Sequence, residues 1–210
     1  MESSTHRLTL PLGEQEVRAL HAGDMVFLDG EIVITAGMPT HERILEYLDA
    51  GKPLPTQFAG GTLFHLGSYS REVDGHYEVL YMNPTTSTRF NPFMPTLVRR
   101  LGLRAIGGKG GLDRESVAAM KESGCVYLSF LGGGAALHTA AIKSVVSVAW
   151  PDLIFQYRLV RLLVENLGPL TVAIDAHGRS LYEDLRVSAE NRLPEILSQL
   201  ARARADGGTI

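Results

Sequence analysis

Short apolar strands alternate with helical patterns over the second half of the chain, and this alternation constrains the fold more than any other feature. Asp113 is a good N-cap for one of the helices, and a triple-glycine turn opens another. The expected elements are a strand at 104–106, a helix at 113–123, a strand at 126–130, a helix at 132–141, a strand at 145–150, a helix at 157–165 and a strand at 170–174. Such alternation predicts a parallel sheet with helices packed against it.

The first third of the chain is rich in β-branched residues and predicts a largely antiparallel layer. Asp29-Gly30 divides an apolar run at 25–35, and this dipeptide is typical of a tight hairpin. Asp74-Gly75 gives the same signal just before a strand expected at 77–82. A helix with Pro39 in its first turn should lie between the two hairpins.

Together these patterns predict an α/β fold with three layers: an antiparallel β layer, a parallel central sheet and helices. No linker divides the chain, so we expect residues 1–210 to form one domain. The ends, at 1–6 and 205–210, are expected to fray, as chain termini commonly do.

Charge and cysteine content exclude several classes of protein. The net charge of -3 gives no general attraction for nucleic acid or for a membrane surface. The sequence shows neither an apolar run of membrane-span length nor an apolar signal-peptide core, so we expect a cytoplasmic protein. The single cysteine, Cys125, excludes a disulfide within the chain and a cysteine-bound iron–sulfur cluster. The histidines lack metal-ligand spacing, so no metal site is expected.

A run of hydroxyl side chains followed by an arginine is the first candidate site. Thr85, Thr86, Ser87 and Thr88 come after an expected strand and lead to Arg89. Hydroxyls, exposed N–H groups and a guanidinium suit a carboxylate or a phosphate. A Ser/Thr turn with the arginine on the surface would give the same pattern, because such turns are common.

The second candidate is the glycine-rich turn 107–111, which carries Lys109 between an expected strand and a helix. In an open α/β sheet ligands bind at this position, and glycines such as Gly108 let the backbone approach them. The spacing differs from a P-loop, which disfavours a nucleotide. A flexible turn with a solvated lysine is the alternative. A third turn, 132–134, more readily serves to pack a helix on the sheet.

Six segments taken together resemble one family, the β subunits of the iron–sulfur hydro-lyases, which include class I fumarase and L(+)-tartrate dehydratase. The residues are more similar to those of tartrate dehydratase than to those of fumarase, notably in the last segment. The matching segments are 10–12, 17–32, 63–67, 84–89, 107–111 and 168–178.

The resemblance implies a swivelling β/β/α domain and a partner. In this family an α subunit or a preceding domain holds a 4Fe–4S cluster, so this chain is expected to carry no cofactor itself. We also expect two-fold association of the subunits. By carry-over, Thr85 and His41 are the expected catalytic residues, Thr85 handling a proton. The expected substrate-binding residues are Thr86, Arg89, Lys109 and Gly108.

The sequence departs from the family pattern at two places. The pattern T-A/C-R-D-x-x-H is here Thr35–His41, so Gly37 stands where the family has an arginine and Met38 where it has an aspartate. The common stretch E-L-G-M-E is here Asp152–Gln156. Losing one bidentate carboxylate contact costs about 2–4 kcal/mol of binding. We therefore expect a substrate with one carboxylate fewer, or with an apolar group at that position.

Two functions remain open from the sequence. The first is reversible dehydration of a hydroxy-dicarboxylate such as tartrate or malate, together with an iron–sulfur α subunit. This reaction removes a proton next to a carboxylate and expels hydroxide, which needs a base and a Lewis acid. The second is a catalytically silent relative that binds a carboxylate or regulates a partner.

Overall fold

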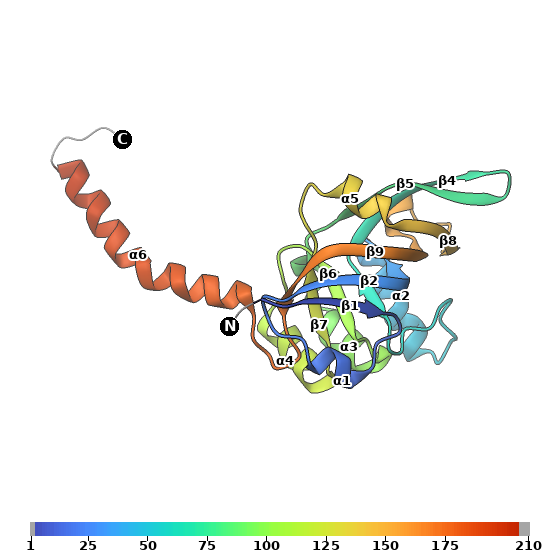
Figure 1. The fold of residues 1–210 in the computed structure, drawn as a ribbon, viewed down its shortest axis with the longest axis horizontal. Helices are drawn as coiled ribbons and strands as arrows, with labels where there is room; N and C mark the ends of the chain where they lie inside the picture. The colour runs from blue at the N-terminus through green and yellow to red at the C-terminus, as the bar shows by residue number, and fades with distance from the viewer. Residues whose placement is uncertain (1–2, 206–210) are drawn as a thin grey trace.

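One mixed sheet of seven strands organises the described chain, residues 3–205 of a computed structural model (Figure 1). The strand order is β1-β2-β3-β6-β7-β9-β8, and β9 also pairs with β2, so the strands from β2 to β9 close into a ring. A hairpin of β4 and β5 forms a second sheet. The strands are β1 (Thr5–Thr9), β2 (Met25–Ile34), β3 (Thr62–Phe64), β4 (Leu66–Val73), β5 (His76–Pro84), β6 (Ala105–Gly108), β7 (Val126–Ser129), β8 (Ile142–Ala149) and β9 (Leu159–Ile174).

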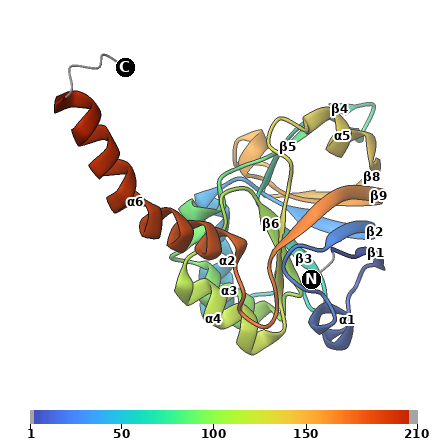
Figure 2. The same ribbon diagram turned by 60° about the vertical axis from the view of Figure 1, so that its left-hand side comes forward.

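Helices cover the sheet unequally. Figure 1 shows α3 and α4 on one side of the strands, and α5 with the β4–β5 hairpin on the other. The helix α6 leaves the body and projects outward, as both ribbon views show (Figure 2). The helices are α1 (Glu14–Arg18), α2 (Met38–Asp49), α3 (Met94–Leu101), α4 (Arg114–Ser123), α5 (Ala135–Ala140) and α6 (Leu181–Ala205), with short 3₁₀ turns η1 (Ser87–Phe90) and η2 (Phe155–Tyr157). No helix among residues 3–205 has both the length and the apolar character that a membrane crossing requires.

Strand directions confirm part of the predicted sheet. The neighbours β6 and β7 run parallel, as the alternation of strands and helices in the second half of the chain predicts. The pairs β1–β2, β2–β3 and β3–β6 are parallel too, so the prediction of a largely antiparallel first third is wrong for β1, β2 and β3. The long strand β9 runs antiparallel to β2, β7 and β8. The fold is therefore mixed α/β, and the antiparallel pairs are made mainly by the end of the chain rather than by its first third.

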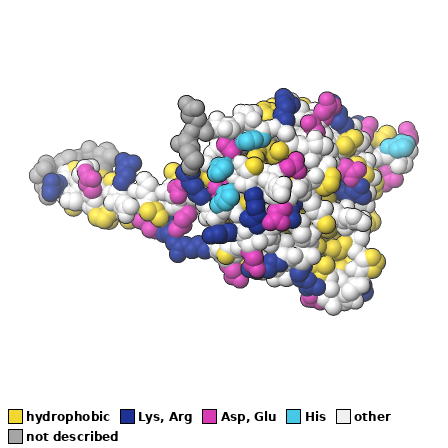
Figure 3. Space-filling model, turned by 60° about the horizontal axis from the view of Figure 1, so that its bottom comes forward, with side chains coloured by type: hydrophobic (Ala, Val, Ile, Leu, Met, Phe, Trp, Pro, Cys, Tyr) yellow, Lys and Arg dark blue, Asp and Glu magenta, His cyan; other side chains and the backbone are white. Residues whose placement is uncertain are grey.

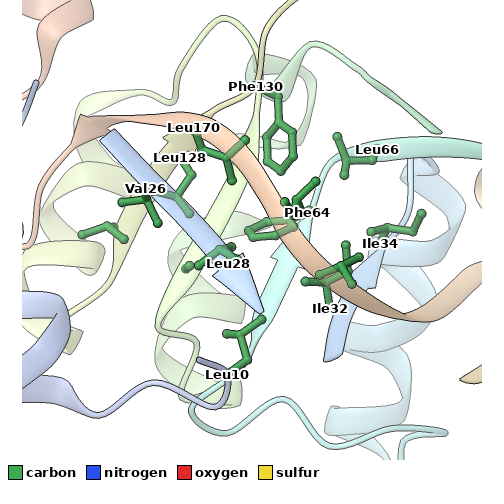
Figure 4. Close-up of a cluster of buried hydrophobic side chains, with 14 of the residues drawn as sticks. Leu10, Val26, Leu28, Ile32, Ile34, Phe64, Leu66, Leu128, Phe130 and Leu170 are labelled. Atoms are coloured by element: carbon green, nitrogen blue, oxygen red, sulfur yellow. The ribbon is translucent and has the colours of Figure 1, made fainter. Parts of the chain in front are cut away.

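Two buried clusters hold these elements together. One fills the ring beneath β9, where the rings of Phe64 and Phe130 meet edge to face with centroids 5.1 Å apart (Figure 4). The other lies between the sheet and the helices and includes Ile44, Leu97 and Met120, all fully buried. Each fully buried large apolar side chain contributes about 1.5–3 kcal/mol. These clusters fix the strand ends that carry the candidate site.

The hairpin predicted at Asp29-Gly30 is wrong. β2 continues through this dipeptide, and the pairing register with β9 shifts between Leu28 and Gly30, which marks a β-bulge. Gly30 has a φ of 111°, and a Cβ there would lie 3.1 Å from the carbonyl oxygen of Leu10. The glycine thus serves a bulge and a close backbone approach, which the sequence alone does not distinguish from a turn.

The helix predicted at 157–165 is also wrong. Only Tyr157 belongs to a short 3₁₀ turn, and from Leu159 the chain forms β9. Val160, Leu162 and Val164 are buried while the residues between them face outward, which is the period of a strand. The partner β2 lies far away in sequence, so the pairing that selects a strand here is tertiary.

Other boundaries agree or move by a few residues. Asp113 caps α4 by accepting a hydrogen bond from the backbone N–H of Ser116, and Asp74-Gly75 forms the tip of the β4–β5 hairpin, as predicted. The first strand of the chain, β1, spans Thr5–Thr9. Of the ends expected to fray, Thr5 and His6 lie in β1 and Ala205 is the last residue of α6. Residues 1–2 and 206–210 lie outside the described part, so the expectation of frayed ends stays a prediction.

Candidate functional site

The hydroxyl run and the glycine-rich turn lie side by side where β5 and β6 end. The backbone N–H of Ser87 donates to the carbonyl of Lys109 at 2.8 Å, and the N–H of Lys109 donates to the carbonyl of Thr85 at 3.1 Å. Thr86 and Lys109 form a parallel β-bridge. The structure therefore brings the two predicted anion motifs together as one hydrogen-bonded unit.

A cavity of about 430 Å³ opens beside this unit. Thr85, Arg89 and Lys109 all line it, and the two cations are the only charged side chains among its described lining residues. The other lining residues are Ala36, Gly67, Tyr81, Asn83, Pro84, Ile154, Gln156 and Tyr157. A cavity with two cations, a hydroxyl and otherwise uncharged walls is suited to an acid with a carboxylate at one end.

Thr86 and Gly108, both predicted to bind substrate, support this cavity without lining it. Thr86 contributes the backbone bridge to Lys109. Gly108 is buried beneath the loop, and a Cβ there would lie 2.3 Å from the hydroxyl oxygen of Ser87. Any larger residue at 108 would displace Ser87, so this glycine sets how closely the two motifs approach.

Arg89 contacts the predicted proton-handling residue directly. Its guanidinium donates a hydrogen bond to the side-chain hydroxyl of Thr85. A neutral threonine hydroxyl is a weak base, and a positive charge beside the oxygen favours its negatively charged form. Arg89 is thus placed both to hold an anionic ligand and to assist Thr85.

Buried polar side chains lie behind the loop. His65 Nδ1 is 2.8 Å from the Ser87 hydroxyl, and that hydroxyl is 2.8 Å from the Tyr127 hydroxyl. Ser87, His65 and Tyr127 are all fully buried. Because both bonds end on Ser87, they hold the middle of the hydroxyl run against the sheet.

His41, predicted to be catalytic, lies in the same buried layer and does not line the cavity. Its ring stacks on Phe90 at a centroid distance of 4.3 Å, and its Nδ1 donates to the Gly37 carbonyl at 2.7 Å. The centroids of the His41 and His65 rings are 5.3 Å apart. The Phe93 ring also lies near it, and a part for His41 in a reaction stays a prediction.

Burial keeps both histidines neutral near pH 7. It lowers the pKa of His41 to about 4, against an upward pull from the Gly37 carbonyl. Burial, followed by the charges of His41 and Arg89, places the pKa of His65 well below its usual value. A second positive charge beneath the Arg89 loop is therefore disfavoured in the folded state.

We predict that acid destabilises the fold through His41. In the unfolded chain histidine binds a proton near pH 6.5, whereas folded His41 does so only near pH 4. The free energy of unfolding is therefore unaffected by His41 above pH 6.5. It falls by about 3 kcal/mol as the pH drops from 6.5 towards 4, because over this range the unfolded chain binds a proton that folded His41 excludes. Denaturant unfolding followed by circular dichroism at several pH values measures this slope.

Two variants test that assignment. His41→Phe should reduce the fall in unfolding free energy between pH 6.5 and pH 4 by the share of one histidine, because the variant no longer excludes a proton at position 41 while buried His65 still does. His76→Gln, at the exposed start of β5, should keep the wild-type slope. An unchanged slope in His41→Phe would show that other groups dominate acid unfolding.

Sequence reasoning missed the wall formed by Ile154, Gln156 and Tyr157. The Ala36 N–H donates to the carbonyl of Gln156 at 2.9 Å, and the Thr35 hydroxyl donates to the Tyr157 carbonyl at 3.1 Å. The two departures from the family pattern, at 37–38 and 152–156, are therefore neighbours in space. The sequence showed both departures, but they are more than 100 residues apart, so it did not indicate that they contact each other.

Gly37 has no room for a side chain in this arrangement. A Cβ there would lie 2.6 Å from the Cβ of Tyr157 and 2.9 Å from its Cα. These separations are below normal van der Waals contact, and one of the two atoms belongs to the backbone. The segment ending at Tyr157 thus takes the space into which an arginine at position 37 would begin to extend.

An iron–sulfur cluster does not fit the residues of this chain. Among residues 3–205 no group of three or more histidine, cysteine or acidic side chains is arranged to hold a metal ion. Cys125 is fully buried, and burial raises the pKa of its thiol. A single buried thiol cannot supply the several thiolates that such a cluster needs.

This chain is similar to known proteins over most of its length. The family model described as Fumarase C-terminus matches residues 2–185. A protein of Methanocaldococcus jannaschii assigned as an L(+)-tartrate dehydratase subunit beta is 33% identical, covering 94% of this chain and 99% of the relative. The L(+)-tartrate dehydratase subunit beta of Escherichia coli K12 is 29% identical, covering 89% of this chain and 92% of its own.

A third relative is longer. A protein of Geobacillus stearothermophilus assigned as a class I fumarate hydratase is 31% identical over 90% of this chain, and the match spans 35% of that protein. A region similar to this chain therefore occurs in proteins named as separate β subunits and as part of a larger polypeptide.

Proposed function

The chain belongs to the fumarase C-terminus family, and from that premise we propose that it is the β subunit of a hydro-lyase acting on a hydroxy-carboxylic acid. The observation that carries the proposal is the meeting of Thr85, Arg89 and Lys109 in one cavity. The names of its relatives support this choice among the possible uses of an anion-binding cavity.

Each residue has a separate part in the proposed reaction. Arg89 offers a planar fork for a carboxylate, and Lys109 adds a second positive charge. The Thr85 hydroxyl first gives its own proton to a basic group that we assign to the partner subunit, and the deprotonated oxygen then takes the proton from the carbon next to that carboxylate. The C–H electron pair becomes the new carbon–carbon double bond as hydroxide leaves. The carboxylate gains negative charge as the proton leaves, so the two cations stabilise the transition state more than the bound acid.

The remaining chemistry belongs to a partner in this proposal. Expulsion of hydroxide needs a Lewis acid, and the residues of this chain do not fit the 4Fe–4S cluster that the resemblance implies. We assign that cluster to an α subunit, for which the name subunit beta, carried by the relatives, provides a precedent. The swivelling three-layer arrangement and the cytoplasmic location expected from the sequence are part of the same proposal.

We further propose that the substrate differs from malate and fumarate. Gly37 has no side chain and no room for one, and the neighbouring wall of Ile154 and Tyr157 carries no charge. This chain can therefore anchor one carboxylate firmly at Arg89 and Lys109. An acid with an uncharged group towards Tyr157 suits that wall better than a second carboxylate does.

The test is co-expression with the neighbouring gene product under anaerobic conditions, followed by a screen of hydroxy acids for loss of water. We expect dehydration of at least one acid, with kcat/KM higher than for malate. Comparable rates on malate would refute the altered substrate but leave the hydro-lyase. No turnover, together with carboxylate binding by the isolated chain, would favour the second candidate, a silent carboxylate-binding relative; the change at Gly37 is what supports it.

A further inference from the structure

The helix α6 is attached to the body only at its beginning. The rings of Tyr182 and Tyr127 meet with centroids 6.0 Å apart, and Glu183 forms an ion pair with Arg114 at 2.6 Å. From residue 184 to residue 199 every side chain is exposed. All views show the helix extending from the body with nothing in the described chain against it (Figures 1 and 3).

One face of this projecting helix is apolar. Leu185 is 69% exposed, Leu193 51% and Leu197 55%. The stripe consists of Leu185, Ala189, Leu193, Ile196, Leu197, Leu200 and Ala203. At 100° per residue these positions span about 120° of the helix surface, the width of a face that packs against a partner. Figure 3 shows apolar side chains along the helix, between charged ones.

The spacing of the stripe is that of a coiled coil. Ala189, Leu193, Ile196, Leu200 and Ala203 follow one another at intervals of 4, 3, 4 and 3 residues. This repeat occupies the a and d positions of successive heptads. The partner that it fits is therefore another helix with a similar repeat.

The charges on α6 identify that helix. Residues 181–191 contain three carboxylates and one arginine, a net charge of -2, while residues 192–205 contain three arginines and one glutamate, a net charge of +2. Two copies placed antiparallel put each acidic half beside a basic half. A parallel pair would instead place like charges together.

The geometry of the whole chain permits the same arrangement. Residues 186–205 lie beyond the matched family region, which ends at residue 185. They form about 30 Å of helix, measured along its path at 1.5 Å per residue. Pro194 lies inside this helix, and Figures 1 and 2 show that α6 bends along its length. Because the body lies at the beginning of α6, antiparallel pairing places the two bodies at opposite ends of the pair.

We propose that α6 pairs with α6 of a second copy of this chain in an antiparallel two-helix coiled coil. The same stripe serves both partners, as a two-fold axis requires. Leu193 of each copy then faces Ile196 of the other, and Ala189 faces Leu200. This interface lies away from the cavity at Arg89 and Lys109, so the proposal does not depend on the proposed function.

The first test is sedimentation equilibrium of the full chain. We expect a dimer of twice 22.9 kDa that dissociates on dilution. Leu193→Glu combined with Leu200→Glu should raise the dimer dissociation constant at least about 30-fold, since it places two charges in the stripe. Val187→Glu is the matched control: Val187 is exposed on the same helix but lies outside the stripe, so the dimer should persist.

The second test measures orientation with engineered cysteines. A chain carrying Ala189→Cys is mixed with a chain carrying Leu200→Cys and oxidised. An antiparallel pair joins the two different chains, whereas a parallel pair joins like chains. Cys125 does not interfere, because it is fully buried.

Three results would overturn all or part of the proposal. One is a full chain that stays monomeric at every concentration, which would leave α6 to a different protein. Another is a dimer whose dissociation constant is unchanged by Leu193→Glu with Leu200→Glu, which would place the contact elsewhere. Cross-linking of Ala189→Cys only to itself would refute the antiparallel orientation. Circular dichroism checks that every variant is folded. We expect that they all are, because side chains on the projecting part of α6 do not pack against the body.

Discussion

Replacing Arg89 with alanine should lower kcat/KM of the assembled hydro-lyase by about 10²–10³-fold, the cost of losing one charged group that stabilises a developing anion. Arg89 lines the cavity and donates to the Thr85 hydroxyl. The variant therefore loses a carboxylate contact and the positive charge beside the proposed base. Steady-state kinetics on the best acid found in the screen measures the effect.

Matched variants separate this effect from a general loss of surface charge. Arg71→Ala removes an arginine of the β4–β5 hairpin that is paired with Glu78 at 2.9 Å and does not line the cavity, so kcat/KM should not change. Arg89→Lys keeps the charge but loses the planar fork, and it should fall between alanine and wild type. Wild-type kinetics in Arg89→Ala would remove the arginine from the proposed mechanism.

Local signals in the sequence succeeded where the physical cause is itself local. Asp113 caps α4 because a carboxylate can reach an N–H three residues ahead, whatever the rest of the chain does. Asp74-Gly75 makes a hairpin because both residues adopt positive φ, at 50° and 77°. Neither structure needs a distant partner, so the sequence alone is sufficient to predict it.

The same reasoning failed wherever β9 decides the structure. Gly30 is a bulge instead of a turn because the strand on both sides of it pairs with β9. Residues 159–165 are a strand because β2 and β8 lie on either side of them. Both partners are distant in sequence, and a short apolar run with a glycine or a valine does not report such pairing.

In the candidate site, too, the residues of local motifs could be predicted from the sequence, whereas those placed by tertiary contacts could not. Thr85, Arg89 and Lys109 could be predicted because each belongs to a short motif whose residue types alone indicate an anion site. The wall at Ile154 and Tyr157 could not, since it follows from how residues 152–158 fold back over Gly37. The walls of the cavity, which limit the substrate, are therefore the part of the site that required the structure.

Thr85→Ala should lower kcat by about 10²–10⁴-fold with little change in KM, because the hydroxyl is proposed to move a proton while Arg89 and Lys109 hold the acid. Thr85→Ser keeps the hydroxyl and should retain most of the activity. Thr88→Ala removes an exposed hydroxyl of the same loop that does not line the cavity, and its kinetics should match wild type. A rise in KM alone for Thr85→Ala would make this residue a binding group.

The double variant Thr85→Ala with Arg89→Ala tests whether the contact between the two side chains is functional. If Arg89 acts partly by favouring the charged form of the Thr85 oxygen, that part of its effect is already lost once the hydroxyl is gone. The double variant should then lose less activity than the product of the two single losses predicts. Strictly multiplicative losses would mean that Arg89 serves the carboxylate alone and that Thr85 draws its assistance from the partner subunit.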